Sequence, residues 1–120
     1  MSGLSGVGTL NRERNSDLQV AAWTAAREPA GASTLSFGIT LTLQHATHLQ
    51  VLDLSVLSEH DLRRVVAHRA PVYLLVQMGV MNGQVAAQST GRNYRSLQAN
   101  PGLIRLGELH GYTLMRVNAS

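Results

Sequence analysis

One apolar run constrains the fold more than any other feature of the sequence. Residues 72–76 read VYLLV, with no charged side chain, and Pro71 stands immediately before them. A short run of Val, Leu and aromatic residues is typical of a β-strand that is buried on both faces. Such a strand needs other elements packed on each side of its sheet, as in parallel sheets. The run therefore predicts a sheet that is covered by helices on both faces.

Helix signals alternate with strand signals before this run. Ser16 and Gln19 have the spacing of a capping box, and they predict a helix that ends at Pro29. Its apolar stripe at helical spacing consists of Leu18, Ala21, Ala22, Ala25 and Ala26. Residues 34–37 are then expected to form a short strand, which ends at Gly38. The first part of the chain thus predicts a helix followed by a strand.

The next two helices each follow a strand. We expect Thr40 to cap a helix over residues 41–48, and residues 50–55 to form a second strand. Ser58, three residues before Asp61, is the expected N-cap of a third helix, which ends at Pro71. The buried stripe of this third helix consists of Leu62, Val65 and Val66.

The last third of the chain predicts two short helices and a hairpin. Residues 83–100 have helical potential that Gly91 is expected to interrupt. Two strand-like runs follow, over 103–109 and 112–117, and the link His110-Gly111 between them fits a type I′ turn. The side chains expected to face the core are Ile104 and Leu106 on the first arm, and Leu114 with Met115 or Val117 on the second.

This order of elements predicts an α/β fold. We expect a three-layer sandwich with a mostly parallel, Rossmann-like sheet and a C-terminal antiparallel hairpin. A chain of 120 residues suits one domain. Residues 1–15 are rich in Gly and Ser and then polar, so we interpret them as a flexible linker, with the single α/β domain over 16–120.

Composition excludes several classes of function. The chain has no cysteine, which rules out disulfides, thiolate metal sites and thiol nucleophiles. The net charge is +3, but every basic residue is a scattered Arg and aromatic residues make up only 4%, so we expect no nucleic-acid partner. The N-terminus lacks the pattern of a signal peptide, and no apolar stretch approaches the ~20 residues of a membrane span.

Polar residues follow the predicted parallel strands and define a candidate crevice. In open α/β sheets ligands bind beyond the carboxyl ends of the strands. The residues expected there are Gly38, Thr40, Ser58, Gln77 and Asn82. The same residue types favour helix caps and turns, and that interpretation is the stronger of the two.

No other constellation supports chemistry. His45 and His48 lie three residues apart on a predicted helix, and Asp53 follows, but no further metal-ligand motif accompanies them. The glycines at 6 and 8 lack the strand and the third glycine of a dinucleotide-binding loop. No serine stands in a nucleophile elbow. We therefore assign no catalytic, cofactor-binding or metal-binding residue, and we expect no cofactor.

Several stretches, in order, resemble one known family. They are 17–23 (DLQVAAW), 35–45 (LSFGITLTLQH), 51–54 (VLDL) with Leu57-Ser58, 71–76 (PVYLLV) and 107–117 (GELHGYTLMRV). Together these stretches resemble the C-terminal soluble domain of bacterial GT-C-type membrane glycosyltransferases. That family comprises relatives of dolichyl-phosphate-mannose protein mannosyltransferases and aminoarabinose transferases. The resemblance covers about residues 15–118.

The resemblance implies a function without catalysis in this chain. In that family the catalytic carboxylate and the polyprenyl-phosphate-sugar site lie in the membrane-embedded half. The chain is then a non-catalytic, extracytoplasmic domain that supports or covers the membrane active site or contacts the acceptor. Its partners are the membrane half of the same polypeptide and the acceptor substrate. The alternative is a free-standing α/β module that binds a small ligand or a protein, and a small enzyme in its own right is a third hypothesis.

Overall fold

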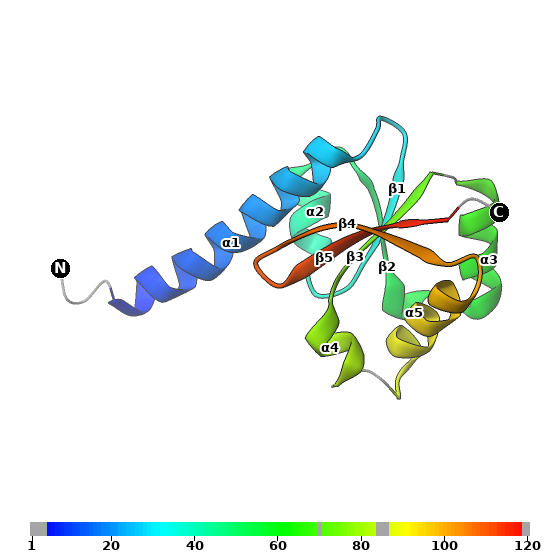
Figure 1. Ribbon diagram of the computed structural model, residues 1–120. Helices are drawn as coiled ribbons and strands as arrows, with labels where there is room; N and C mark the ends of the chain where they lie inside the picture. Colours follow the sequence, from blue (N-terminus) through cyan, green and yellow to red (C-terminus); the bar gives the residue numbers. More distant parts are fainter. Residues whose placement is uncertain (1–4, 70, 84–86, 119–120) are drawn as a thin grey trace.

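The computed structural model describes residues 5–69, 71–83 and 87–118, with side chains described from residue 15 onward (Figure 1). The helices are α1 (Ser5–Arg27), α2 (Thr40–Ala46), the 3₁₀ turn η2 (Leu54–Val56), α3 (Glu59–His68), α4 (Met78–Asn82) and α5 (Ser89–Ala99). The strands are β1 (Ser33–Ser36), β2 (Gln50–Asp53), β3 (Val72–Gln77), β4 (Leu103–Leu109) and β5 (Tyr112–Val117). Among these helices none is long and apolar enough to cross a membrane.

The strands form one mixed sheet in the order β2-β1-β3-β5-β4. Strands β1, β2 and β3 pair in parallel, whereas β5 is antiparallel to both β3 and β4. The predicted α/β class and the C-terminal antiparallel hairpin are confirmed. The parallel pairing is confined to the first three strands. Because β3 lies in the middle of the sheet, the apolar run at 72–76 is buried along its whole length, as predicted.

Side chains of β3 alternate between two separate hydrophobic clusters. Leu74 and Val76 belong to a cluster with residues of α3 and α5, whereas Tyr73 and Leu75 belong to a cluster with residues of α1 and α2. Successive side chains of a strand point to opposite faces of its sheet, so the two clusters lie on opposite faces. Because helices cover β3 on both faces, the side chains at 72–76 are buried, and this run carries no charged residue.

Helix α1 differs from its prediction in both its start and its buried face. It begins at Ser5 instead of Ser16, so 5–15 is helical rather than a nonhelical lead-in. A capping box marks the start of a helix only where the residues before it are not helical. The segment NRERN at 11–15 contains Arg and Glu, which favour helix, and no Pro, so the helix continues through it. The buried positions of its described side chains are Val20, Ala21 and Thr24, and Glu28, directly after the helix, is buried too.

The expected stripe of Leu18 and four alanines is therefore wrong except at Ala21 and, in part, Ala25. Leu18 is 40% exposed, and Ala22 and Ala26 are exposed too. Alanine buries little area, so a pattern of alanines orients a helix weakly. Val20 and the half-buried Trp23 contribute more surface to the second cluster and set the rotation of α1. The same rotation carries the carboxyl group of Glu28 into the protein.

The expected break at Gly91 does not occur. Gly91 is buried within α5, and the gap between α4 and α5 falls at residues 83–88 instead, of which 84–86 lie outside the described residues. A glycine inside a helix costs about 1 kcal/mol relative to Ala. Two hydrogen bonds from the Asn93 amide, to the carbonyl oxygens of Leu54 (2.9 Å) and Leu57 (2.8 Å), hold α5 against η2 and offset that cost.

The hairpin confirms the predicted turn and corrects one of its arms. His110 (φ 50°) and Gly111 (φ 82°) both have positive φ, which a type I′ turn requires. In β5, Leu114, Met115 and Val117 are all buried, as expected. In β4, however, Ile104 and Leu106 are 38% and 43% exposed. Strand β4 is the edge of the sheet and contains a register shift between Arg105 and Gly107, which changes the alternation of its side chains.

Replacing Gly111 by Ala tests the turn. A left-handed conformation costs a residue with a Cβ roughly 1–2 kcal/mol, so we expect Gly111→Ala to lower the free energy of unfolding by about that amount. The matched control is Gly79→Ala, because Gly79 has ordinary helical geometry and no atom within 4 Å of an added Cβ. That variant should be neutral or slightly stabilising. Urea denaturation measures both, and equal effects would contradict the turn assignment.

Candidate functional site

The carboxyl ends of β1 and β2 meet in a closed polar cluster. Thr40 Oγ1 lies 2.8 Å from Ser36 Oγ and donates to Asp53 Oδ2 at 3.0 Å. The other carboxylate oxygen of Asp53 accepts from the backbone N–H of Ser55 (2.8 Å) and from its hydroxyl (2.5 Å). The sequence predicted that Thr40 caps α2, and this is wrong, because the residue at the N-cap of α2 is Ile39. Thr40 is a buried tie between two strands, and its hydroxyl is already engaged.

The other residues of the predicted crevice have local roles or make no polar side-chain contact with the residues that the structure describes. Ser58 is the N-cap of α3, as expected, and accepts from the backbone N–H of Asp61 at 3.1 Å. Gln77 precedes α4 without a capping hydrogen bond from its side chain, and Asn82 is exposed at the end of that helix. Gly38 has φ +87°, and a Cβ there would lie 3.7 Å from Tyr112 Oη. None of these four residues lines either cavity described below.

The histidine pair does not form a metal site with its neighbours. His45 and His48 are both exposed, and Asp53 is engaged with Thr40 and Ser55. Within the described ranges no group of three His, Cys, Asp or Glu side chains is arranged to hold a metal ion. The position of Asp53 two residues before Ser55 could have predicted its role, because an Asp side chain often accepts from the backbone N–H two residues later.

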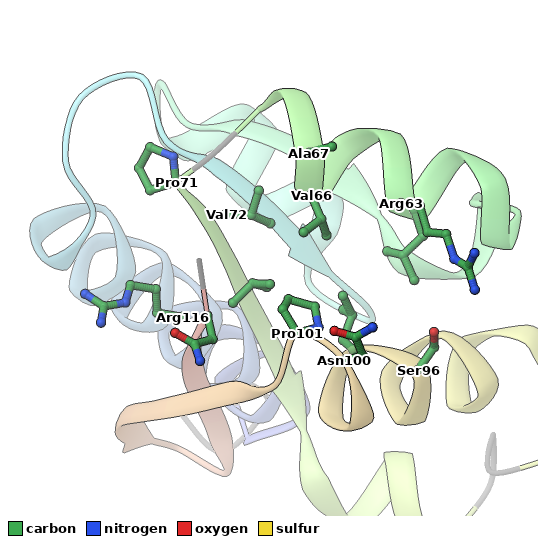
Figure 2. A pocket seen from close by; sticks show the side chains of 13 residues that line it. Arg63, Val66, Ala67, Pro71, Val72, Ser96, Asn100, Pro101 and Arg116 are labelled. Atoms are coloured by element: carbon green, nitrogen blue, oxygen red, sulfur yellow. The ribbon is translucent and has the colours of Figure 1, made fainter. Parts of the chain in front are cut away.

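A larger hollow lies between α3 and α5, and we call it the α3–α5 groove (Figure 2). Its volume is about 940 Å³. It is bounded by the start of β3 at Pro71 and Val72, by Asn100-Pro101 before β4 and by the end of β5. These boundaries place it near the amino ends of the parallel strands, at the edge opposite to the predicted crevice.

The groove follows from how the two helices face the sheet. Leu62 and Leu97 are turned into the first hydrophobic cluster. Residues on the flanks of the helices, such as Val66, Ala67 and Ser96, are left between them and line the groove. Each helix therefore packs on the sheet, and the space between the two is only partly filled.

Two arginines lie at the rim of the α3–α5 groove. In Figure 2 Arg63 and Arg116 lie on opposite sides of the cavity, with Val66, Val72 and Pro101 between them. Arg63 forms an exposed ion pair with Glu59 at 2.9 Å. Arg116 makes no ion pair within the part of the chain that the structure describes, and no Asp or Glu lines the groove. Arg116 lies opposite Tyr73 in the register of β5 on β3, and Tyr73 belongs to the cluster with α1 and α2, so the Arg116 side chain lies on the other face of the sheet. The groove therefore has a mainly apolar floor, and the arginine on its own face, Arg63, is paired with Glu59.

A smaller cavity, of about 350 Å³, adjoins a buried carboxyl group. It lies where α1 ends and β2 begins, and its lining includes Glu28, His48 and Leu49. Glu28 is 8% exposed, and one of its oxygens accepts from Thr34 Oγ1 at 2.6 Å. The other, Oε2, has no hydrogen-bond partner among the described residues. Desolvation by burial raises the pKa of Glu28 to about 7, although the Thr34 hydrogen bond opposes the shift.

Sequence reasoning missed both cavities. Nothing in the local sequence of Glu28 separates it from the other acidic residues. The walls of the larger groove come from segments far apart in the chain, which no local pattern joins. Comparisons with known proteins add no assignment: no family model, curated protein or solved structure matches this chain.

The raised pKa of Glu28 predicts a pH dependence of stability. The unfolded carboxyl group has a pKa near 4.5 and the folded one about 7, so the folded state holds the proton more tightly. Stability from this group is present below pH 4.5 and is lost as the pH rises towards 7, with a slope of at most about 1.4 kcal/mol per pH unit. We expect Glu28→Gln to remove this loss, because the amide has the same shape and no charge.

Urea denaturation at pH 5 and pH 8 tests the effect. Wild type should lose more stability between the two values than Glu28→Gln does. The control is Glu59→Gln, which removes an exposed carboxylate whose ion pair is worth ~0–1 kcal/mol. If Glu28→Gln and wild type lose the same amount, Glu28 is ionised in the folded protein and the burial argument fails.

Proposed function

We propose that this chain is the non-catalytic, extracytoplasmic α/β domain of a membrane glycosyltransferase that uses a polyprenyl-phosphate-sugar donor. The observation that carries the proposal is the geometry of α1. This helix runs without interruption for 23 residues, which corresponds to a length of roughly 35 Å. Its first part extends away from the sheet, and its second part packs on α2 and the sheet (Figure 1).

The second part of α1 is fixed to the domain at three places. Val20 and Ala21 are fully buried in the second hydrophobic cluster. Gln19 Oε1 lies 2.6 Å from the His110 ring at the tip of the hairpin. The Trp23 ring packs so closely against β4 that a Cβ on Gly107 would lie 3.0 Å from it. Because α1 is held on several sides, its direction relative to the sheet is set by packing.

A helix held in this way suits an attachment to a membrane half. A continuous helix transmits orientation along its axis, whereas a Gly/Ser linker does not. In the proposed assembly α1 fixes the position of the domain over the membrane active site, where it covers the site or contacts the acceptor. The stretch 17–23, one of those that resemble that family, lies within this fixed second part of α1 and supports the same placement. We also propose the three-layer, Rossmann-like architecture as the finer description of the fold, supported by the clusters on both faces of the sheet.

The gene upstream of residue 1 gives the first test. We expect an open reading frame that encodes several apolar spans of ~20 residues in the same polypeptide. A start codon at residue 1 with no such spans before it would contradict the proposal. That outcome would favour the free-standing binding module, which the volume of the α3–α5 groove supports independently.

The second test uses the full-length protein in membranes. Val20→Asp places a charge at a fully buried position between α1 and the sheet, so the attachment of the domain should fail. We expect sugar transfer from a polyprenyl-phosphate-sugar donor to fall roughly tenfold or more. The matched control is Ala22→Asp, two residues along on the exposed side of α1, which should transfer at close to the wild-type rate. Wild-type transfer by Val20→Asp would overturn the proposed role.

A further inference from the structure

We propose that Glu28 and Thr34 form a proton-dependent latch between α1 and β1. While the Glu28 carboxyl group is protonated, the latch holds the C-terminal end of α1 on the sheet. When that proton passes to water, the end of α1 is released. This Glu28–Thr34 latch does not depend on the glycosyltransferase assignment, since it rests on contacts within the chain alone.

One buried hydrogen bond connects the end of α1 to the neighbouring strand. Glu28 comes directly after α1, and its Oε1 accepts from Thr34 Oγ1 on β1 at 2.6 Å. Thr34 is fully buried and Glu28 is 8% exposed, so water does not compete for this bond. Between them the chain turns through Gly31 (φ 84°) before β1 begins at Ser33. The side-chain bond therefore closes the loop that joins the helix to the strand.

The site suits a neutral carboxyl group and not a carboxylate. Glu28 Oε2 is buried and has no hydrogen-bond partner among the described residues, and the same holds for Thr24 Oγ1 one helical turn earlier. A buried carboxylate needs an opposite charge or several donors. Its place at the C-terminal end of a 23-residue helix, where the backbone carries partial negative charge, adds to the cost. Ionisation therefore destabilises the closed latch, and burial raises the pKa of Glu28 to about 7.

The charged groups nearest to Glu28 along the chain and in the cavity do not compensate a carboxylate. Arg27 lies over the Trp23 ring, 4.6 Å from its centroid, and donates to the Trp23 carbonyl oxygen at 3.0 Å. His48, before β2, lines the cavity beside Glu28. Neither side chain forms an ion pair with Glu28 in the part of the chain that the structure describes.

The strands place one further cation on the same face of the sheet, but at a distance. Tyr73 on β3 lies opposite Thr34 in the register, and Arg116 on β5 lies opposite Tyr73. Neighbouring strands are about 4.8 Å apart, so two strand spacings of about 10 Å separate the backbone of Arg116 from that of Thr34. Arg116 is exposed and forms no ion pair with Glu28 among the described residues.

The smaller cavity gives the ionised side chain a route to water. It has a volume of about 350 Å³ and adjoins Glu28. Most of its lining is exposed, including Pro29, Gly31, His48 and Gln50. A carboxylate that turns into this cavity is hydrated without any change in the sheet, but it leaves Thr34 behind on β1. The loss of that bond frees the last turn of α1 and the loop at 28–32, while Val20 and Ala21 remain packed.

A nuclear magnetic resonance titration from pH 5 to pH 9 tests the latch. We expect amide shifts concentrated at residues 25–34, with one midpoint near pH 7. Glu28→Gln should abolish the transition, because the amide accepts the same hydrogen bond and has no proton to lose in this range. Thr34→Val should move the midpoint to higher pH, because the Thr34 hydrogen bond favours the ionised form. The matched control is His48→Gln, which removes the other titratable side chain of the cavity lining and should leave the transition unchanged.

Amide hydrogen exchange shows whether the opening is local. The N–H of Glu28 donates to the carbonyl oxygen of Thr24, and that of Ala32 to Pro29, both at 3.2 Å. Low urea concentrations should change their exchange little, because a local opening exposes little surface. After correction for intrinsic exchange, opening should increase about tenfold between pH 6 and pH 8, for a carboxyl group with a pKa of 4.5 when open and about 7 when closed. Glu28→Gln should show no such increase.

Four results would overturn the proposal. The first is a transition near pH 7 that persists in Glu28→Gln, and the second is its loss in His48→Gln. The third is a midpoint in Thr34→Val at or below that of wild type. The fourth is exchange at Glu28 and Ala32 that urea accelerates as steeply as exchange in β3, since both would then report only global unfolding. Thermal unfolding of each variant shows that it is folded at the pH values used.

Discussion

Strand β3 is removed from water on both faces, and the other elements of the fold lie where that burial requires them. Tyr73 and Leu75 need the cover of α1 and α2 on one face, and Leu74 and Val76 need α3 and α5 on the other. A strand with this composition is unstable at an edge, where one face or one row of backbone groups meets solvent. Its neighbours β1 and β5 complete the pairing on each side. The position of α1, and with it the proposed attachment, follows from this requirement.

Features that depend on local chemistry are predictable from the sequence, and features that depend on tertiary balance are not. The VYLLV strand, the Ser58 cap and the His110-Gly111 turn each rest on a few adjacent residues, and all three occur as predicted. The continuity of α5 through Gly91 was mispredicted, because a distant contact offsets the cost of that glycine. The start of α1 was mispredicted for a local reason, since the capping-box spacing at Ser16 outweighed the helix-favouring residues before it. The hydrogen bonds from Asn93 to η2 join residues 36 to 39 positions apart, which no local pattern encodes.

The same distinction explains the functional site. Polar residues after strands were expected to line a crevice, but the fold uses Thr40 and Asp53 to tie β1 to β2 and Ser58 to begin a helix. In each case a short polar side chain provides a hydrogen bond to a nearby buried or helix-end group, a role that Ser, Thr and Asp favour. The α3–α5 groove has no local signature, because its walls come from segments that are far apart in the chain.

The register shift between Arg105 and Gly107 also bears on how copies of the molecule meet. Strand β4 is a free edge of the sheet, and its exposed side chains include Ile104 and Leu106. A straight edge of this kind presents a regular row of N–H and C=O groups, on which another chain can add a strand. The bulge interrupts that row, and the exposed Arg105–Glu108 pair, at 2.8 Å, places charge beside it. The edge is therefore a poor template for fibrous self-assembly, even though two apolar side chains remain in contact with water.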